Sequence, residues 1–186
     1  MNTHKVNHMI ETDRIFLRPF CMEDIHRFSE ICANPNVMRY IGNGQPVSRD
    51  MIAEKIPEWM ALYAKQKYGL MALVLKKTEV LIGFCGLIHQ MVDGNEYIEL
   101  GYRLDEAHWG KGIATEAAIA VRDYAFNMLK IPVLISIIHH KNHASKRVAN
   151  KIGMRLMKQT SFKNIMVDVF CLKRKDFKTS DQPAIN

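Results

Sequence analysis

The sequence predicts an α/β (α+β) fold, with a mixed, mostly antiparallel, twisted sheet of about seven strands flanked by about four helices. Three observations predict it. Two helical patterns follow a short first strand, three strand-like segments then succeed one another across tight turns, and strands and helices alternate in the last third. Hydrophobic residues make up 48% of the 186 residues, which is enough to bury a core between a sheet and its helices.

The first third of the chain predicts one strand and two helices. Arg14–Pro19 is typical of a strand and ends at its proline. Met22–Ala33 carries apolar residues at helical spacing, and the Asn34-Pro35 pair ends that helix. Ser48 is an expected N-cap for a second helix that runs to about Lys65, and Pro57 should kink or split this helix.

The middle of the chain predicts an antiparallel meander of three strands. Its segments are Tyr68–Leu75, Val80–His89 and Tyr97–Leu104. Lys76–Glu79 supplies the turn between the first two, and the Asp93-Gly94 pair is a strong turn signal before the third. The meander therefore ends with a strand that leads directly into a glycine-rich loop.

The last third predicts alternating helices and strands. The expected elements are a helix over Lys111–Lys130, a strand over Val133–Ile138, a short helix over Asn142–Lys151 that ends at Gly153, and a closing hairpin of Arg155–Thr160 and Ile165–Leu172. The strand-helix-strand unit within residues 97–138 should place its two strands parallel. We expect one domain over residues 1–177 and a polar C-terminal tail over residues 178–186.

Composition excludes several classes of protein. The sequence contains no run of eighteen uncharged apolar residues and no apolar stretch near its start, so we expect neither a membrane span nor a secretory signal. The four cysteines form no CxxC pair, which suits a reducing cytoplasm. The net charge of +7 is compatible with nucleic-acid binding, but the basic residues are dispersed without stacking aromatics, so we expect no direct nucleic-acid contact.

The sharpest local feature is the glycine-rich segment His108–Glu116, which follows a strand and opens a helix. Its small residues let a ligand approach the backbone, free amides at a helix start bind phosphate, and Lys111 adds positive charge. The segment lacks the Gly-Lys-Ser/Thr end of a P-loop, as well as the third glycine and distant acid of a dinucleotide fingerprint. A pyrophosphate loop for coenzyme A and a strand-to-helix turn that serves packing alone both remain open.

Six segments carry a family resemblance in the same order along the chain. They are Glu11–Phe20, Asn34–Tyr40, Ile82–Leu87, Glu99–Leu104, Trp109–Ala117, and Asn142–Ser145 followed by Lys151–Met154. Together they resemble the branch of the GNAT acetyltransferase superfamily that includes the ribosomal-protein-alanine N-acetyltransferases. The resemblance implies an acetyl-CoA-dependent N-acetyltransferase, and it spans roughly residues 11–176.

The resemblance also implies a cofactor site. A V-shaped opening is expected between the strands that end near Leu104 and Ile138, with pantetheine hydrogen-bonded to the backbone near Tyr102, Arg103 and Leu104. The residues expected to hold the pyrophosphate, or to flank it, are Trp109, Gly110, Lys111, Gly112, Ile113, Ala114 and Thr115, and Asn142 and Ser145 should contact the cofactor from the following helix. The sequence departs from many relatives at Trp109, where those enzymes place glutamine or arginine.

Two residues are candidates for catalysis. Glu99, on the strand that leads into the loop, is the candidate base, with Glu96 as a weaker one, and the alternative for Glu99 is a structural ion pair with Arg103. Many relatives place an acid tyrosine where this chain has Ala149, so Ser145, which matches the serine proposed for the ribosomal-protein branch, is the candidate acid. The alternative for Ser145 is a helix residue bonded to backbone or cofactor. Acetyl transfer by direct attack in a ternary complex needs no covalent cysteine.

The acceptor is open at this stage. A protein N-terminal amine such as that of a ribosomal protein, and a small amine such as an aminoglycoside or polyamine, are both compatible with the sequence, as are a non-catalytic acyl-CoA-binding module and a homodimer. Acceptor contacts are expected from Ile41–Tyr68 and from the loop near Phe162; Glu54 and Glu58 in that first segment either attract a cation or form a solvated helix face. His139, His140 and His143 lack a nearby carboxylate or cysteine in sequence, so we expect no metal site.

Overall fold

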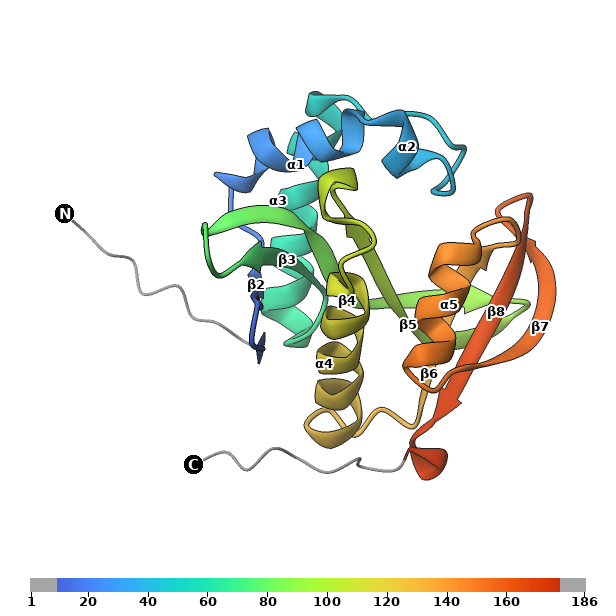
Figure 1. The fold of residues 1–186 in the computed structure, drawn as a ribbon. Helices are drawn as coiled ribbons and strands as arrows, with labels where there is room; N and C mark the ends of the chain where they lie inside the picture. Colours follow the sequence, from blue (N-terminus) through green and yellow to red (C-terminus); the bar gives the residue numbers. More distant parts are fainter. Residues whose placement is uncertain (1–9, 178–186) are drawn as a thin grey trace, which may run out of the picture.

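The computed structural model describes residues 10–177, and these form a sheet of eight strands in the order β1-β2-β3-β4-β5-β6-β8-β7 (Figure 1). The strands are β1 (Ile10–Glu11), β2 (Ile15–Pro19), β3 (Leu70–Leu75), β4 (Val80–Val92), β5 (Asn95–Leu104), β6 (Val133–His139), β7 (Arg155–Phe162) and β8 (Ile165–Lys173). The predicted tail, residues 178–186, lies outside the described residues, as do residues 1–9.

Five α-helices and two 3-10 turns complete the described part of the chain. They are α1 (Asp24–Ala33), α2 (Pro35–Met38), α3 (Arg49–Gln66), α4 (Ile113–Asn127) and α5 (His143–Lys151), with η1 (Glu106–His108) and η2 (Arg174–Asp176). The mixed, mostly antiparallel sheet predicted from the sequence is confirmed, including the parallel pairing of β5 with β6.

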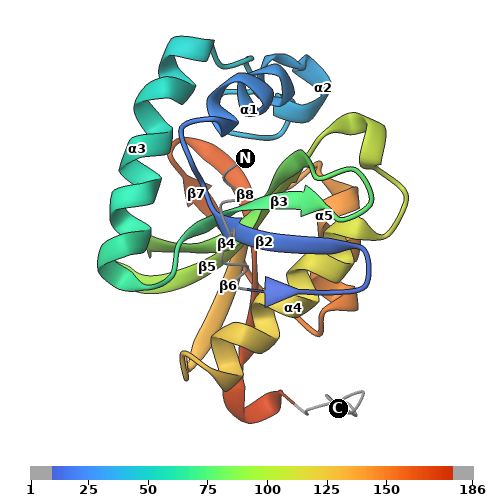
Figure 2. The same cartoon turned by 90° about the vertical axis from the view of Figure 1, so that its left-hand side faces the viewer.

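Helices cover both faces of the sheet. Figure 2 shows α3 on one side of the strands and α4 with α5 on the other. The apolar residues of α4 and α5 pack with the sheet in the largest buried cluster, which includes Val121, Phe126 and Leu134. A second cluster joins α1 and α3 to the opposite face around Phe28, Ile56 and Phe84. The strands between these helix layers are therefore buried on both faces, and they form a rigid frame for the loops at their ends.

Several boundaries differ from the sequence-based expectations. Strand β1 has only two residues, too few for an alternating pattern, and it forms by pairing Ile10 with Leu17. Helix α2 was not expected; Asn34 caps it by accepting a hydrogen bond from the Asn36 amide, with Pro35 at the first helical position. Helix α4 begins two residues later than expected.

Helix α3 runs unbroken through Pro57, so the predicted split does not occur. Pro57 lies on the exposed side of the helix, while Ile52 and Ile56 are buried against the sheet. The backbone carbonyl that loses its partner to the proline ring is therefore near the solvent side, where the loss is tolerated. Ser48 caps the helix as predicted, because its Oγ accepts a hydrogen bond from the Met51 amide at 3.3 Å.

Candidate functional site

The two central strands separate at the point where the site forms. β5 and β6 pair only at Ile98 with Leu134 and at Glu99 with Ile135. β5 nevertheless continues along β4 to Leu104, and β6 continues along β8 to His139. The two strands therefore diverge from a common vertex, and a cavity of about 1000 Å³ opens between them. This is the V-shaped cleft that the family resemblance implied.

A side chain closes the vertex of this cleft. Ser136, which is 4% exposed, donates a hydrogen bond from Oγ to the Leu100 carbonyl at 2.7 Å. At the far end of β5, the Trp109 indole donates from Nε1 to the Leu104 carbonyl at 2.9 Å. Backbone groups alternate along a strand, so Tyr102, midway between these residues, also directs its N–H and C=O to the open edge. Arg103 instead directs its backbone to β4, in register with Phe84.

The glycine-rich loop presents free backbone amides at the mouth of the cleft. Gly110 and Gly112 adopt φ angles of 73° and 77°, which L side chains rarely take, and α4 begins directly after Gly112. The Glu116 amide donates to the Gly112 carbonyl at 3.0 Å, so the amides of residues 113–115 precede the first intrahelical bond. No side chain within residues 10–177 caps them. Their orientation and the helix dipole favour an anion at this place.

Contacts from the turn between β1 and β2 hold the loop in position. Arg14 donates from Nε to Glu116 Oε2 at 2.6 Å and from a terminal guanidinium nitrogen to the Lys111 carbonyl at 2.8 Å, and Thr12 donates to Glu116 Oε1 at 2.6 Å. Burial raises the pKa of Glu116, but the hydrogen bonds from Thr12 and Arg14 outweigh it, so this pKa is lowered. The Lys111 ammonium donates to the Ala107 carbonyl at 2.8 Å and turns back toward η1.

Helix α5 brings Asn142 and Ser145 to the same cleft. Asn142 caps the helix by accepting a hydrogen bond from the Ser145 amide at 3.1 Å. The Tyr102 hydroxyl donates to the Ser145 carbonyl at 3.2 Å, which links α5 to β5 across the cleft. Among the described residues, none is hydrogen-bonded to the Ser145 hydroxyl. Ala149 is 1% exposed and packs in the core.

Glu99 lies at the vertex of the cleft on the side opposite α4 and α5. Its carboxylate accepts hydrogen bonds from Gln90 Nε2 at 2.8 Å and from the Ile137 amide at 3.4 Å. The alternative that Glu99 pairs with Arg103 is wrong, because Arg103 instead contacts the thiol of Cys32. Burial raises the pKa of Glu99 despite the two hydrogen bonds that favour the charged form. Glu99 is therefore a stronger base than an ordinary carboxylate.

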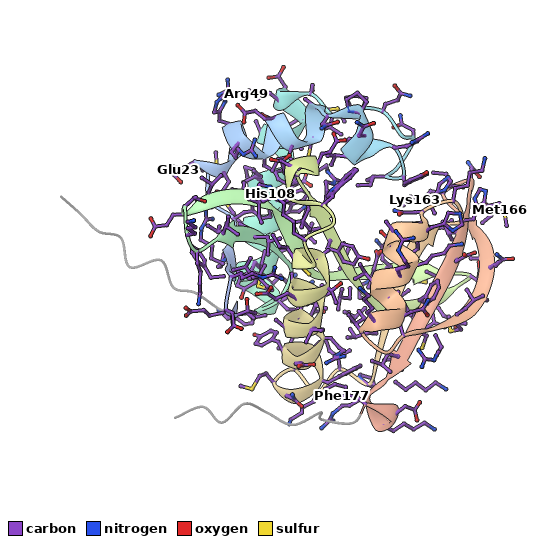
Figure 3. The ribbon with its side chains drawn as sticks, viewed as in Figure 1. Glu23, Arg49, His108, Lys163, Met166 and Phe177 are labelled. Carbon is purple, nitrogen blue, oxygen red and sulfur yellow. The ribbon has the colours of Figure 1, made fainter. Side chains whose placement is uncertain are left out.

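Residues from two distant segments form the walls on the Glu99 side. Arg39 and Tyr40 follow α2. Phe162 is the last residue of β7, and Lys163 lies in the turn at the tip of the β7–β8 hairpin (Figure 3). The Tyr40 and His139 rings approach to 5.2 Å between centroids. Arg39 and Tyr40 were not predicted as site residues, because the short helix α2 that positions them was not expected.

The expected acceptor segment 41–68 contributes less to the cavity than the sequence suggested. Among its residues, Ile41 and Gly42 line the cavity. Glu54 is exposed, and Glu58 forms an exposed ion pair with Lys55 at 2.8 Å. Of the two alternatives for these glutamates, the structure shows the solvated helix face.

His139, the last residue of β6, and His140, which follows it, contact each other and the neighbouring strand β8. The His139 and His140 rings stack at 4.7 Å between centroids, and His140 Nδ1 lies 3.2 Å from the Met166 carbonyl. Within residues 10–177, no group of three or more His, Cys, Asp or Glu side chains is arranged to hold a metal ion. In the same range, no helix combines the length and the apolar character needed to cross a lipid bilayer.

Comparisons with known proteins agree with this geometry. The acetyltransferase (GNAT) domain model matches residues 14–155. An uncharacterized Bacillus subtilis protein, YkkB, is 36% identical over 154 residues, covering 79% of this chain and 85% of its own. The crystal structure of an acetyltransferase from Agrobacterium tumefaciens is 29% identical, with a TM-score of 0.74 over 92% of this chain and 98% of its own.

The chain belongs to the GNAT acetyltransferase family. It is therefore an N-acetyltransferase that uses acetyl-CoA and acts on an amine acceptor. The ribosomal-protein branch is related more distantly: RimL, a ribosomal L7/L12 alpha-N-protein acetyltransferase in complex with coenzyme A, superimposes with a TM-score of 0.75 at 14% identity. It covers 89% of this chain and 97% of its own, and at this identity the likeness shows the fold alone.

Proposed function

We propose that this chain transfers an acetyl group from acetyl-CoA to a primary amine by direct attack in a ternary complex, and that the acceptor is a protein N-terminal amine. The observation that carries the proposal is the position of Glu99. It lies where β5 and β6 part, with the open strand edge and the α4 amides on one side and a second, polar half of the cavity on the other. One cavity thus offers places for both substrates at a shared vertex.

The residues present fit coenzyme A. The amides of residues 113–115 suit its pyrophosphate, and the φ angles of 73° and 77° at Gly110 and Gly112 shape that loop. The exposed edge at Tyr102 suits the amide groups of pantetheine, as an added strand would. Asn142, Ser145 and Trp109 line the same part of the cavity. When bound, acetyl-CoA supplies the thioester-activated acetyl group.

Glu99 is the proposed base. An amine attacks only when neutral, so a group near the vertex must accept its proton, directly or through a water. Burial raises the pKa of Glu99, which brings its basicity closer to that of the amine. The Tyr102 amide, directed at the open edge, is placed to donate to the acetyl oxygen as negative charge develops there.

Ser145 is the proposed acid for the departing thiolate. It lines the cavity on the face opposite Glu99, and its main chain is held on both sides by Asn142 and by the Tyr102 hydroxyl. Those two contacts leave the side-chain hydroxyl available to the substrate. A thiol with a pKa of about 8.5 is a tolerable leaving group unaided, so this contribution should be smaller than that of the base.

The opening between α2 and the β7–β8 hairpin supports a peptide acceptor. Its walls come from Arg39, Tyr40, Phe162 and Lys163. What favours a chain end over a small molecule as the acceptor is that RimL, whose name describes transfer to a protein α-amine, shares this fold. The acceptor class therefore needs a direct test with both kinds of amine.

The test measures thiol release from acetyl-CoA against a panel of N-terminal peptides, polyamines and aminoglycosides, with mass spectrometry to locate the acetyl group. Glu99→Gln should lower kcat by about 10²–10⁴-fold, and Ser145→Ala should lower it less. Glu96→Gln, which alters an exposed glutamate in the same strand, should leave kcat unchanged. Equal turnover by Glu99→Gln and the wild type would remove Glu99 from the mechanism, and acetylation of small polyamines but no peptide would overturn the acceptor class.

A further inference from the structure

Arg103 differs from the other half-buried arginines of the described chain. Within residues 10–177, Arg18, Arg27 and Arg122 are also half-buried, and each forms an ion pair with an aspartate. Arg103 has no carboxylate partner in that range, and its Nε is buried without a hydrogen bond. A guanidinium is charged at any physiological pH, so an unpaired one in a half-buried place is a costly feature.

The surroundings of Arg103 hold it in place without neutralising it. Its guanidinium lies 5.9 Å from the centre of the Phe28 ring and 5.3 Å from that of Phe84, and a terminal nitrogen lies 3.0 Å from the Cys32 sulfur. Burial raises the pKa of the Cys32 thiol, so this partner stays uncharged at neutral pH. Two aromatic faces and a neutral thiol orient the cation and leave its charge unbalanced.

Arg103 lines the same half of the cavity as Glu99. Side chains four residues apart on a strand share a face, so both project away from α4 and α5, with their Cα atoms about 13 Å apart. Arg39 and Lys163 add positive charge to the walls of this half, and no ion pair at salt-bridge distance engages either of them within the described residues. Glu106 also lines the cavity, but its oxygens accept hydrogen bonds from the Asn34 and Asn36 side chains.

We propose that the acceptor is a primary amine that also carries an anionic group, a carboxylate or a phosphate, with its amine at Glu99 and its anion at Arg103. Arg39 and Lys163 attract this acceptor from the cavity walls. The proposal rests on the proposed function and narrows its acceptor class: a peptide with an acidic residue after its N-terminal residue fits, whereas polycations such as polyamines and aminoglycosides are disfavoured. Charge-assisted hydrogen bonds to a guanidinium supply the selectivity.

The experiment uses acceptors matched in shape but not in charge. The carboxylate arm compares alanyl-aspartyl with alanyl-asparaginyl peptide amides, the phosphate arm compares phosphoethanolamine with ethanolamine, and spermidine serves as the cationic probe. In the wild type, kcat/KM for the better anionic acceptor should exceed that for its neutral partner by about tenfold or more. The arm with the larger ratio of kcat/KM between the anionic and the neutral acceptor shows whether the preferred anion is a carboxylate or a phosphate.

Two variants test whether the preference for the anionic acceptor depends on Arg103. Arg103→Met should remove this preference mainly by raising KM for the anionic acceptor, and Arg103→Lys should retain part of the preference. Arg49→Met removes an exposed arginine at the start of α3 (Figure 3) and is the matched control, which should keep the full preference. The Kd for acetyl-CoA should be unaffected in all three, and folding is checked by thermal unfolding. A preference for the neutral or cationic acceptor, or an anionic preference retained in Arg103→Met, would overturn the proposal.

A binding readout separates this proposal from the proposed function. Calorimetry of the coenzyme A-saturated protein with phosphoethanolamine and with the alanyl-aspartyl peptide amide needs no turnover. Binding that weakens about tenfold or more in Arg103→Met supports the anion site even if no amine is acetylated, and that result would contradict only the transfer reaction. Turnover of amines without any preferential binding of the anionic ones would contradict only the anion site.

Discussion

Glu99 shows at the level of one residue how burial changes chemistry. Its carboxylate accepts two hydrogen bonds that favour the charged form, yet burial raises its pKa. From its place before the glycine-rich loop, Glu99 is a candidate base in the sequence, and the alternative of an ion pair with Arg103 is wrong. Both residues project from the same face of β5, but their contacts depend on β4, β6 and α1, which the local sequence does not specify.

The raised pKa of Glu99 predicts a pH-dependent stability difference. The folded state binds this proton more tightly than the unfolded state, so the stability that the protonated group contributes is present below the unfolded pKa of about 4.3 and is lost as pH rises through the higher folded pKa. Glu99→Gln removes this loss of stability at higher pH, because glutamine does not ionise. Its Tm should therefore exceed that of the wild type at neutral pH, and the two should converge below about pH 4.

Thermal unfolding across pH measures this difference, with Glu96→Gln as the exposed control that should follow the wild type. A wild-type Tm above that of Glu99→Gln at neutral pH would mean that Glu99 stabilises the fold as a charged group, and it would contradict a role in which stability is sacrificed for basicity.

At the scale of elements, local signals predicted most of the strands and helices. Alternation, turn pairs and caps indicated β3, β4, β5 and the β7–β8 hairpin, and Ser48 correctly marked the start of α3. The missed elements are those stabilised by distant partners. β1 exists through its pairing with β2, and α2 is tied to η1 by hydrogen bonds from Asn34 and Asn36 to Glu106.

The approach of β3 to β4 depends on one glycine. A Cβ added at Gly86 would lie 2.2 Å from the Gly69 carbonyl oxygen and 2.7 Å from the Leu70 Cα, so the strands would have to move apart. Gly86→Ala should lower the free energy of unfolding by about 2–4 kcal/mol.

The register partner of Gly86 offers a matched control for this prediction. At Gly101, a Cβ would approach only the end of the Ile88 side chain, at 3.2 Å, and this side chain can shift. Gly101→Ala should therefore cost less than about 1 kcal/mol. Denaturant unfolding of both variants measures the two free energies of unfolding. Equal decreases in the two variants would show that the backbone contact at Gly86 does not determine the cost of an added Cβ.

On the scale of the whole molecule, function depends on an incomplete sheet. β5 and β6 exchange only a short stretch of pairing, and their divergence creates the cavity that the proposed site residues line, with the exception of Lys111. The sequence indicated the two strands and the loop, but only the family resemblance implied their divergence. Where two strands part depends on the whole packing of α4, α5 and the β7–β8 hairpin, and no local pattern encodes it.

The central claim is that the cleft and the α4 loop bind acetyl-CoA, and calorimetry of acetyl-CoA binding to Gly112→Glu tests it most directly. A Cβ added at Gly112 would lie 3.6 Å from a guanidinium nitrogen of Arg14, and the carboxylate that it carries at the start of α4 would repel phosphate. Gly94→Glu is the control. Gly94 has a φ angle of 76°, close to the 77° of Gly112, and no atom lies within 4 Å of a Cβ added there. Gly94 lies in the β4–β5 turn, away from the cavity. The account predicts about 100-fold or greater loss of affinity in Gly112→Glu and wild-type affinity in Gly94→Glu. Equal affinity in Gly112→Glu and the wild type, or no acetyl-CoA binding by the wild type, would contradict it.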